Sequence, residues 1–442
     1  MENVEGINEA TIVDITLEGK GVADQKGKVV FVPFTITGER VTFERARRKK
    51  KFDEAKLIEV LEPSPDRVTA KCEYFTHCGG CSIQHISEQA QVEFKQKSVI
   101  DTLSRIGKVT AVNVLPPVVD KAWGYRRRAR LAVKYVQKKG RVLVGFREYS
   151  APYVADMWSC EVLHPNIASL ITPLSEMISQ FSIKDKLPQV ECSVAENATA
   201  LIFRVLEEPS EEDIDKLAEF AEKYSLRVYL QPKGPSTVAP LNNEIFEPPL
   251  AYSLPPFGIK MEFLPIDFIQ VHNEINQKMV QQAIEWLELD DSQNVLDLFC
   301  GLGNFSLPVA QHVASVLGLE GDKELVERAR HNAHINNLDN VEFKKEDLFK
   351  SDSKSAWLAK KWDAVIIDPP RAGAKEVVEL LSKISPSKIL YISCHPGTLA
   401  RDADVLVNTL GYRMEKMNVL NMFPHTGHVE TMALFVKDGS PA

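Results

Sequence analysis

Two reactive side chains stand near the carboxyl end of the chain, each beside a predicted strand. Cys394 lies in Ser-Cys-His-Pro-Gly-Thr, directly after the apolar segment Lys388–Ser393. Glu430 lies in a run with two histidines and precedes the apolar segment Met432–Val436. A thiolate is a nucleophile and a carboxylate can remove a proton, so the pair can form and release a covalent intermediate. The alternatives are a half-buried structural cysteine and a metal at the histidines, for which no third ligand is evident.

A glycine loop indicates a nucleotide-type cofactor. The predicted strand Asn294–Phe299 ends in Cys-Gly-Leu-Gly-Asn (300–304), and Glu320 closes the next strand. Glycines let the backbone approach a ligand closely, and a carboxylate at the end of the next strand can bind ribose hydroxyls. A nicotinamide dinucleotide could use the same geometry, but Ser306 stands where its third glycine is expected.

Two further acidic residues follow predicted strands. Asp347 comes after Asn340–Lys344 and is either a ligand for an adenine amino group or a turn residue. Asp368 begins Asp-Pro-Pro-Arg after the apolar strand Ala364–Ile367, and the two prolines hold the backbone rigidly. Because the carboxyl ends of parallel strands meet at one edge of a sheet, we expect Asp368 and Cys394 to face the same crevice.

Methylation of carbon 5 of uracil requires this combination of groups. That carbon is a poor nucleophile until a thiolate adds at carbon 6, which forms an enolate able to attack the methyl sulfonium of S-adenosylmethionine. A general base must then remove the proton at carbon 5 before the thiolate can leave. Cys394 and Glu430 fit those two roles.

Three cysteines form a tight group, Cys72-x5-Cys78-Gly-Gly-Cys81, and Cys160 is a candidate fourth member. Four thiolates suit zinc or an iron–sulfur cluster, and the spacing alone leaves both open. The spacing differs from the paired Cys-x2-Cys pattern of many zinc sites. In a reducing cytoplasm such cysteines are more often metal ligands, catalytic groups or core residues than disulfides.

The order of the elements predicts three domains. Residues 1–66 contain short segments rich in Val, Ile, Phe and Thr, which indicate a small all-β barrel. Residues 67–262 contain both helix and strand patterns and predict a mixed α+β central domain. Residues 263–442 alternate strand and helix, which predicts an α/β domain around an open parallel sheet.

The net charge of -8 argues against a nucleic-acid partner, but the basic residues are clustered. Residues 121–147 hold ten Lys/Arg and no acid, and residues 40–51 hold seven bases and one acid. In Tyr125–Val136 basic and apolar residues alternate, which predicts a strand with one basic face. Such stretches bind phosphate or form solvated surface. Without a signal peptide or an apolar run of about 20 residues, we expect a cytoplasmic protein with no membrane partner.

Four motifs resemble those of the RNA uracil-5 methyltransferases. They are Asp-Leu-Phe-Cys-Gly-Leu-Gly-Asn (297–304), Asp-Pro-Pro-Arg (368–371), Ser-Cys-His-Pro (393–396) and Pro-His-Thr-Gly-His-Val-Glu (424–430). The resemblance implies a Rossmann-like S-adenosylmethionine methyltransferase domain, with Cys394 as nucleophile and Glu430 as base. It also implies six cofactor contacts, from Gln270, Phe299, Asn304, Glu320, Asp347 and Asp368. One departure is His395, where the family pattern has Asn.

The amino-terminal segments Gly19–Asp24 and Val30–Phe34 resemble a TRAM domain, an OB-like RNA-binding barrel. Together with the cysteines, this resemblance implies the branch of the family that acts on 23S ribosomal RNA. It further implies a [4Fe-4S] cluster, held by Cys72, Cys78, Cys81 and Cys160. We therefore expect a monomeric enzyme that methylates carbon 5 of a uridine in 23S ribosomal RNA. The alternatives are a transfer-RNA uridine-5 methyltransferase, a nonenzymatic RNA-binding iron–sulfur protein and a nicotinamide-dependent oxidoreductase.

Overall fold

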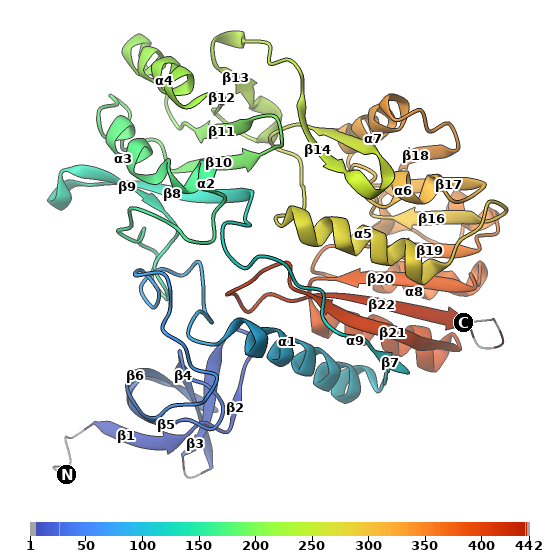
Figure 1. Cartoon of the computed structure of the whole chain (residues 1–442), viewed down its shortest axis with the longest axis horizontal. Coiled ribbons are helices and arrows are strands. Elements are labelled where there is room, and N and C mark those ends of the chain that lie inside the picture. Colours follow the sequence, from blue (N-terminus) through green and yellow to red (C-terminus); the bar gives the residue numbers. More distant parts are fainter. Residues whose placement is uncertain (1–5, 26, 438, 440–442) are drawn as a thin grey trace.

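The computed structural model describes residues 6–25, 27–437 and 439, which form three lobes (Figure 1). The amino-terminal lobe is a six-stranded sheet in the order β1-β5-β6-β4-β3-β2. Its strands are β1 (Ile7–Thr11), β2 (Asp14–Ile15), β3 (Lys20–Gln25), β4 (Lys28–Pro33), β5 (Arg40–Arg48) and β6 (Phe52–Glu62). The sequence did not predict β3, because its two inward-facing residues, Gly21 and Ala23, are too small to give an apolar pattern.

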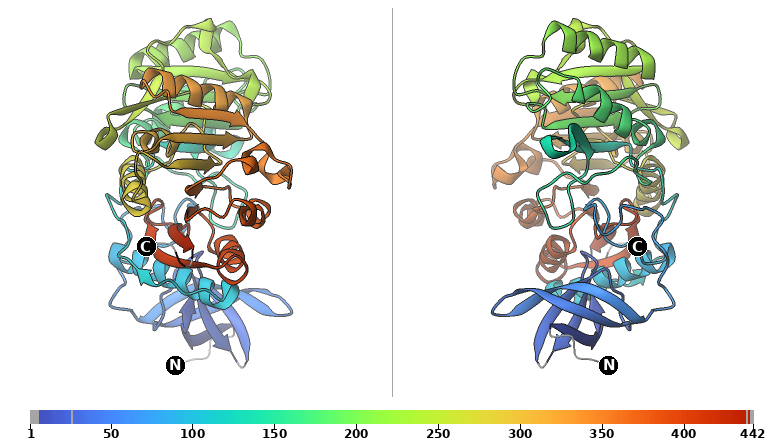
Figure 2. Two further views of the ribbon diagram at one scale, coloured as in Figure 1. Left: turned by 90° about the vertical axis from the view of Figure 1, so that its right-hand side faces the viewer. Right: turned by 90° about the vertical axis from the view of Figure 1, so that its left-hand side faces the viewer.

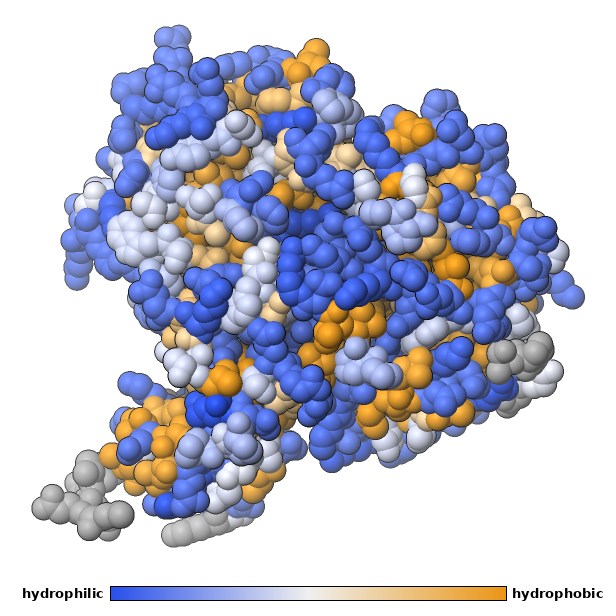
Figure 3. Space-filling view, viewed as in Figure 1, coloured by the Kyte–Doolittle hydropathy of each residue, from blue (hydrophilic) through white to orange (hydrophobic). Residues whose placement is uncertain are grey.

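Apolar side chains gather on the visible face of this barrel, at the lower left of the molecule (Figure 3). The exposed large apolar residues of the barrel are Ile7, Val13, Val29 and Ile58. The inward face is formed by a separate cluster that includes Val30, Val41 and Phe43. The barrel therefore has its own core and presents a mixed apolar and charged surface to solvent.

A long helix, α1 (Glu88–Thr102), lies between the barrel and the carboxyl-terminal lobe (Figure 2). It packs against β21 (Tyr412–Leu420) and begins at Ser87, whose hydroxyl accepts a hydrogen bond from the Ala90 amide. The sequence did not predict this helix. Its buried face carries the polar residues Gln91 and Lys95, so the apolar period of an amphipathic helix is missing.

The central lobe is a six-stranded sheet in the order β13-β12-β11-β10-β8-β9, with three helices. The elements are β8 (Arg128–Val136), β9 (Arg141–Gly145), α2 (Pro165–Ala168), α3 (Ile171–Ser179), β10 (Gln189–Val194), β11 (Thr199–Arg204), α4 (Glu211–Tyr224), β12 (Leu226–Gln231) and β13 (Ala239–Pro240). The alternation of β8 confirms the predicted basic face, with Arg130 and Lys134 exposed. Ser210 caps α4 in a reciprocal capping box with Asp213.

The carboxyl-terminal lobe is an eight-stranded sheet in the order β18-β17-β16-β19-β20-β22-β21-β7. Its elements are β7 (Asn113–Val114), α5 (Asn273–Leu287), β16 (Asn294–Leu298), α6 (Ser306–Ala310), β17 (Ser315–Glu320), α7 (Lys323–Ile335), β18 (Val341–Lys345), β19 (Ala364–Ile367), α8 (Lys375–Leu380), β20 (Lys388–Ser393), α9 (Pro396–Asp404), β21 and β22 (Glu430–Lys437). A separate hairpin, formed by β14 (Leu250–Leu254) and β15 (Ile259–Phe263), precedes α5.

The prediction of a wholly parallel sheet is wrong for the last strands. The five strands from β18 to β20 are parallel, as predicted, but β22 is antiparallel to β20 and β21 is antiparallel to β22. Both faces of the sheet are covered. Val365 and Ile367 pack with residues of α8 and α9, whereas Ile366 packs with residues of α5 on the other face. Among the residues described, no helix is long and apolar enough to span a membrane.

Candidate active site

The parallel strands carry most of the predicted site residues to one edge of the sheet. In the strand register, Leu298 of β16 lies beside Leu319 of β17 on one side and Ile367 of β19 on the other. The residues that follow these positions are Phe299, Glu320 and Asp368. The structure therefore brings three of the six predicted cofactor residues together at the carboxyl ends of adjacent strands, where ligands bind in open α/β sheets.

The glycine loop turns sharply at this edge. Phe299 has a φ of 65°, Gly301 of 54° and Gly303 of 89°, all in the left-handed region. A Cβ atom added to Gly301 would meet nothing within 4 Å, so this glycine faces open space. The amide of Gly301 donates a hydrogen bond to Oε2 of Glu320 at 3.2 Å. The loop and the carboxylate that the sequence paired are therefore in direct contact.

Asn304 and Gln270 are held by a network that the sequence did not predict. The two side-chain amides of Asn304 and Asn276 exchange hydrogen bonds of 2.8 and 3.0 Å, and the Tyr252 hydroxyl donates to Asn304 at 3.1 Å. Arg127 lies over the ring of Tyr252, with its guanidinium carbon 4.6 Å from the ring centroid. Its Nε donates to the backbone carbonyl of Gln270 at 2.9 Å.

Arg127 belongs to the basic run that the sequence assigned to a surface, yet this side chain is buried. Its Nη1 donates to Asn273 Oδ1 at 2.8 Å, and the neighbouring Arg128 donates to the Ile266 carbonyl at 2.8 Å. These contacts tie the first residues of the central sheet to the segment that carries Gln270. Part of the basic run therefore supports the cofactor edge instead of facing solvent.

Asp347 stands apart from the other predicted cofactor residues. It is exposed and forms an ion pair with Lys350 at 2.7 Å. The ring of Phe349, two residues later, lies 5.6 Å from the ring of Phe299. The segment after β18 therefore approaches the glycine loop through Phe349, whereas the Asp347 side chain is exposed to solvent.

Cys394 directly follows β20, and Glu430 is the first residue of the adjacent antiparallel strand β22. The last pair in the register of these strands is Ser393 with Thr431. Cys394 comes one residue after Ser393 and Glu430 one residue before Thr431, so the two lie near each other at the end of the ladder, and the charge of Glu430 acts on the Cys394 thiol. Cys394 also precedes the start of α9, where His395 accepts a hydrogen bond from the Thr398 amide as N-cap. The unexpected His395 thus begins the helix after the nucleophile.

Burial shifts the ionisation of the acidic groups at this site. It raises the pKa of Asp368 to about 7 and that of the Glu430 carboxyl well above its usual range, with a further increase from the charge of Asp368. Burial also raises the pKa of Asp297, behind the glycine loop, to about 7. Burial, and then the charges of Glu430 and Asp368, raise the pKa of the Cys394 thiol to about 11. Without bound cations, the site therefore favours neutral side chains.

A cleft of about 560 Å³ opens above Cys394, between all three lobes. The catalytic lobe contributes Cys394, Arg371 and His428, and the other lobes contribute residues that include Glu18 and Arg126. Cys81, one of the four predicted metal ligands, also lines this cleft. Cationic side chains at its wall are suited to a phosphate backbone.

The loop that leads to Glu430, residues 421–429, is anchored by α1. Lys95 Nζ donates to Asn421 Oδ1 at 3.1 Å and to the Phe423 carbonyl at 2.9 Å, and its side chain is fully buried. The Gln91 carboxamide accepts from the His425 amide at 2.9 Å. We call residues 421–429 the catalytic loop. Its anchors are polar residues that gave no functional signal in the sequence.

Comparison with known proteins identifies the family. The family model described as tRNA (Uracil-5-)-methyltransferase matches residues 120–438. The chain belongs to this family. A second model, the TRAM domain of tRNA (uracil(54)-C(5))-methyltransferase, matches residues 9–65 and confirms the predicted TRAM barrel.

Full-length relatives of this uracil-5 methyltransferase are similar along nearly the whole chain. A protein of Methylococcus capsulatus named 23S rRNA (uracil(1939)-C(5))-methyltransferase RlmD is 45% identical over 96% of this chain and 96% of its own length. A protein of Thiobacillus denitrificans with the same name is 45% identical over 96% of this chain and 98% of its own length.

A solved structure confirms the fold of the family. The crystal structure of Pyrococcus abyssi tRNA (uracil-54, C5)-methyltransferase in complex with S-adenosyl-L-homocysteine is 27% identical, with a TM-score of 0.74. The alignment covers 97% of this chain and 100% of that one. The predicted S-adenosylmethionine-dependent methyltransferase, with its α/β catalytic domain and amino-terminal barrel, is therefore confirmed. A nicotinamide-dependent oxidoreductase is excluded by the family.

The four cysteines of the predicted cluster line one small cavity in this methyltransferase. Cys72, Cys78, Cys81 and Cys160 surround it together with apolar side chains that include Phe146. Burial, with smaller contributions from the charges of the other cysteines, raises the pKa of Cys81 to about 12 and that of Cys160 to about 11. Within the described ranges, no three His, Cys, Asp or Glu side chains are arranged to hold a metal ion. The described residues therefore support neither the predicted [4Fe-4S] cluster nor a zinc ion at these cysteines.

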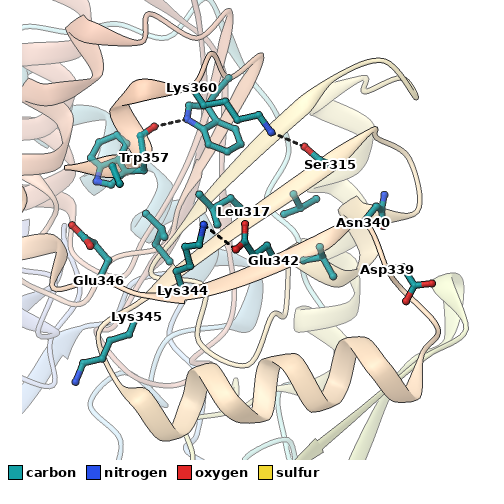
Figure 4. Close-up of a pocket in the computed structure, with 15 residues that line it drawn as sticks. Ser315, Leu317, Asp339, Asn340, Glu342, Lys344, Lys345, Glu346, Trp357 and Lys360 are labelled. Atoms are coloured by element: carbon teal, nitrogen blue, oxygen red, sulfur yellow. Dashed lines mark hydrogen bonds and ion pairs between the residues drawn. The ribbon is translucent and has the colours of Figure 1, made fainter. Parts of the chain in front are cut away.

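A second cavity, of about 420 Å³, lies on the outer strands β17 and β18 of the sheet (Figure 4). Lys344 of β18 and the segment that carries Trp357 and Lys360 form its walls. It contains none of the residues predicted for catalysis, for the cofactor or for metal binding. The active-site assignment therefore rests on the cleft above Cys394.

Proposed function

We propose that the protein transfers a methyl group from S-adenosylmethionine to carbon 5 of a uridine in 23S ribosomal RNA. The observation that carries this proposal is the position of Cys394 near Glu430, since Ser393 pairs with Thr431 between β20 and β22. The names of the relatives, which are 44–45% identical, favour the uridine equivalent to their nucleotide 1939. We also propose that the enzyme is a monomer, and its location would be the cytoplasm, which suits a ribosomal RNA substrate.

The cofactor would be held at the carboxyl edge of the sheet. We assign its binding to the six residues Gln270, Phe299, Asn304, Glu320, Asp347 and Asp368. These residues fit the cofactor. The glycine loop leaves open space for it, the Glu320 carboxylate can accept hydrogen bonds from ribose hydroxyls, and the side-chain amides of Asn304 and Asn276 can bind its charged groups. An unpartnered buried oxygen of Asp297 beneath the loop also favours a cationic ligand there. S-adenosylmethionine supplies an electrophilic methyl group on a sulfonium when bound.

The chain's own residues would carry the chemistry in three steps. The Cys394 thiolate adds to carbon 6 of the uracil, and the ring electrons move to carbon 5 and oxygen 4. Carbon 5 then forms a bond to the methyl group as the bond between that methyl group and the sulfonium sulfur breaks, which would leave S-adenosyl-L-homocysteine, and carbon 5 retains its proton. Finally Glu430, as a carboxylate, removes that proton, and the bond between carbon 6 and Cys394 breaks to release the thiolate. The base must be ionised at the last step, so the raised pKa of the Glu430 carboxyl predicts slower turnover at low pH.

The RNA would enter the cleft between the three lobes. A base in a duplex or stack cannot reach Cys394 unless it turns out of the stack, so we expect the RNA to change shape on binding. Arg126 and Arg371 at the cleft wall suit the phosphates on either side of the target. We propose three domains: residues 1–66 as the RNA-binding barrel, 67–262 as the central domain and 263–442 as the methyltransferase domain.

We also propose a [4Fe-4S] cluster bound by the four cysteines that share one cavity. Four thiolates around one cavity fit the ligand set of a [4Fe-4S] cluster, and the choice of a cluster over zinc rests on the resemblance to the family. Methyl transfer needs no redox centre, so the cluster would stabilise the segment at the mouth of the cleft. Iron and sulfide analysis of anaerobically purified protein should give four of each per chain, and stoichiometric zinc would contradict the cluster.

Mapping of 5-methyluridine in a deletion strain tests the substrate. We expect one uridine of 23S ribosomal RNA to lose its methyl group and the gene, supplied on a plasmid, to restore it. The match to a transfer-RNA family model and to a transfer-RNA enzyme structure makes transfer RNA the alternative. Loss of 5-methyluridine from transfer RNA with an unchanged ribosomal pattern would overturn the proposed substrate.

A further inference from the structure

The turn between β2 and β3 of the barrel, Thr16–Gly19, touches the catalytic loop at Gly427. A Cβ atom added to Gly427 would lie 1.9 Å from the Leu17 carbonyl oxygen and 2.9 Å from the Glu18 Cα. Both are backbone atoms, which cannot swing aside as a flexible side chain can. The Leu17 side chain packs against the core of the catalytic lobe. We call Thr16–Gly19 the barrel turn.

The segment 72–83, which carries Cys72, Cys78 and Cys81 and which we call the cysteine segment, contacts the other side of the same turn. A Cβ atom on Gly19 would lie 2.5 Å from Ile83 Cγ2 and 3.0 Å from the Ser82 carbonyl oxygen. The amides of Ser82 and Ile83 donate hydrogen bonds to the His425 carbonyl at 2.9 and 3.1 Å. The barrel turn, the cysteine segment and the catalytic loop thus meet in one close-packed junction, so the barrel is fixed against the active site.

This junction makes the barrel turn a wall of the cleft that contains Cys394. Glu18 lines that cleft, and its charge acts on His428 of the catalytic loop. Glu18 is the one carboxylate among the described residues that line the cleft, where Arg126 and Arg371 supply positive charge. A carboxylate repels phosphate and only accepts hydrogen bonds, so its natural partner in RNA is the amino group of a base.

We propose that Glu18, placed by the barrel turn, selects the RNA by accepting a hydrogen bond from the amino group of a base that flanks the target uridine. This inference rests on the proposed methylation of an RNA uridine. It makes the barrel part of the active site, with a role in choosing the substrate beyond attracting RNA.

The test compares Glu18→Ala and Glu18→Gln with the wild type on a 23S ribosomal RNA fragment that contains the target uridine. In parallel fragments, each flanking base is replaced by an analogue without its amino group: purine riboside, inosine or 2-pyrimidinone riboside. Glu59→Ala is the matched control, because Glu59 is an exposed carboxylate of the same barrel outside the cleft lining. It removes the same charge without touching the proposed contact.

We expect Glu18→Ala to lower kcat/KM about tenfold on the natural fragment, and Glu18→Gln, which keeps an acceptor oxygen, to recover much of the loss. On the fragment that lacks the amino group bound by Glu18, the wild type and Glu18→Ala should have the same low kcat/KM, because neither can form the hydrogen bond. An equal effect of Glu18→Ala on every fragment, or no loss on the natural one, would overturn the proposal. If the wild type methylates no fragment, the proposed function itself fails, which is a separate outcome.

A second variant tests the junction. Gly427→Ala should push the barrel turn away and reproduce the loss of discrimination between natural and amino-free fragments. Binding of S-adenosylmethionine, measured by calorimetry, should stay unchanged and shows that the protein is folded. Gly234→Ala is the control, since this glycine has an ordinary φ of -77° and no atom within 4 Å of an added Cβ. Full discrimination by Gly427→Ala would contradict the role of the turn.

Discussion

Cys394 should titrate far above an ordinary cysteine, and this shift can be measured directly. Burial is the main reason that its pKa rises to about 11, and the charges of Glu430 and Asp368 add to the effect. The ordinary cysteine pKa from which this rise is reckoned is 9.0. At neutral pH, Cys394 in the cofactor-free protein therefore carries roughly 100-fold less thiolate than an ordinary cysteine.

Alkylation by iodoacetamide reports this difference, because only the thiolate reacts. Trypsin releases Ile389–Arg401, in which Cys394 is the only cysteine, so mass spectrometry follows this thiol alone. The rate should rise about tenfold per pH unit up to about pH 10 in the folded protein, whereas in urea it should level off near pH 9. S-adenosylmethionine, whose sulfonium is positive, should increase the thiolate fraction, and S-adenosyl-L-homocysteine, which lacks that charge, is the control.

A levelling of the rate below about pH 9 in the folded, cofactor-free protein would refute this reasoning. It would mean that burial does not suppress the ionisation of the Cys394 thiol and that the positive amino-terminal end of α9 lowers its pKa instead. An identical effect of the two cofactor forms would refute the electrostatic part alone.

Three further predictions follow from the site. Glu430→Gln should lower turnover at least 100-fold or so and accumulate a methylated RNA–protein adduct on denaturing gels, because the carbon-5 proton stays in place. Lys95→Met should flatten the pH dependence of stability. Burial lowers the pKa of Lys95 to about 7, so between about pH 7 and 10.4 the unfolded chain binds a proton that the folded protein does not. The free energy of unfolding of the wild type should therefore rise by up to about 5 kcal/mol across this pH range. A rise in Tm with pH that is larger in the wild type than in Lys95→Met checks this prediction. Arg127→Lys should weaken S-adenosylmethionine about tenfold by calorimetry, because it loses the bond to Gln270, while RNA affinity is kept.

Motifs at the ends of apolar strands could be predicted well from the sequence. In a parallel α/β sheet, the residue at or just after the carboxyl end of each strand lies at the ligand edge. Once the strand ends are known, this rule alone locates Phe299, Glu320 and Asp368 at that edge. The start of α4 was also predictable, because Ser210, a preferred N-cap residue, precedes the helix.

Contacts between distant segments could not be predicted in the same way. The antiparallel direction of β22 leaves no trace in its apolar sequence, although it sets Cys394 against Glu430. Lys95 and Arg127 have residue types that usually lie at the surface, and their burial follows from hydrogen bonds to residues more than a hundred positions away. The close approach of Gly427 to Leu17 likewise exists only once the lobes are assembled.

Trapping with 5-fluorouridine RNA tests the proposed role of Cys394 most directly. A fluorine at carbon 5 cannot be removed as a proton, so the adduct between Cys394 and carbon 6 should persist after methyl transfer. We predict a stable complex in which the RNA is attached to the peptide Ile389–Arg401, and no complex and no methylation with Cys394→Ala. Attachment through another cysteine, such as Cys300, or measurable turnover by Cys394→Ala would contradict the mechanism.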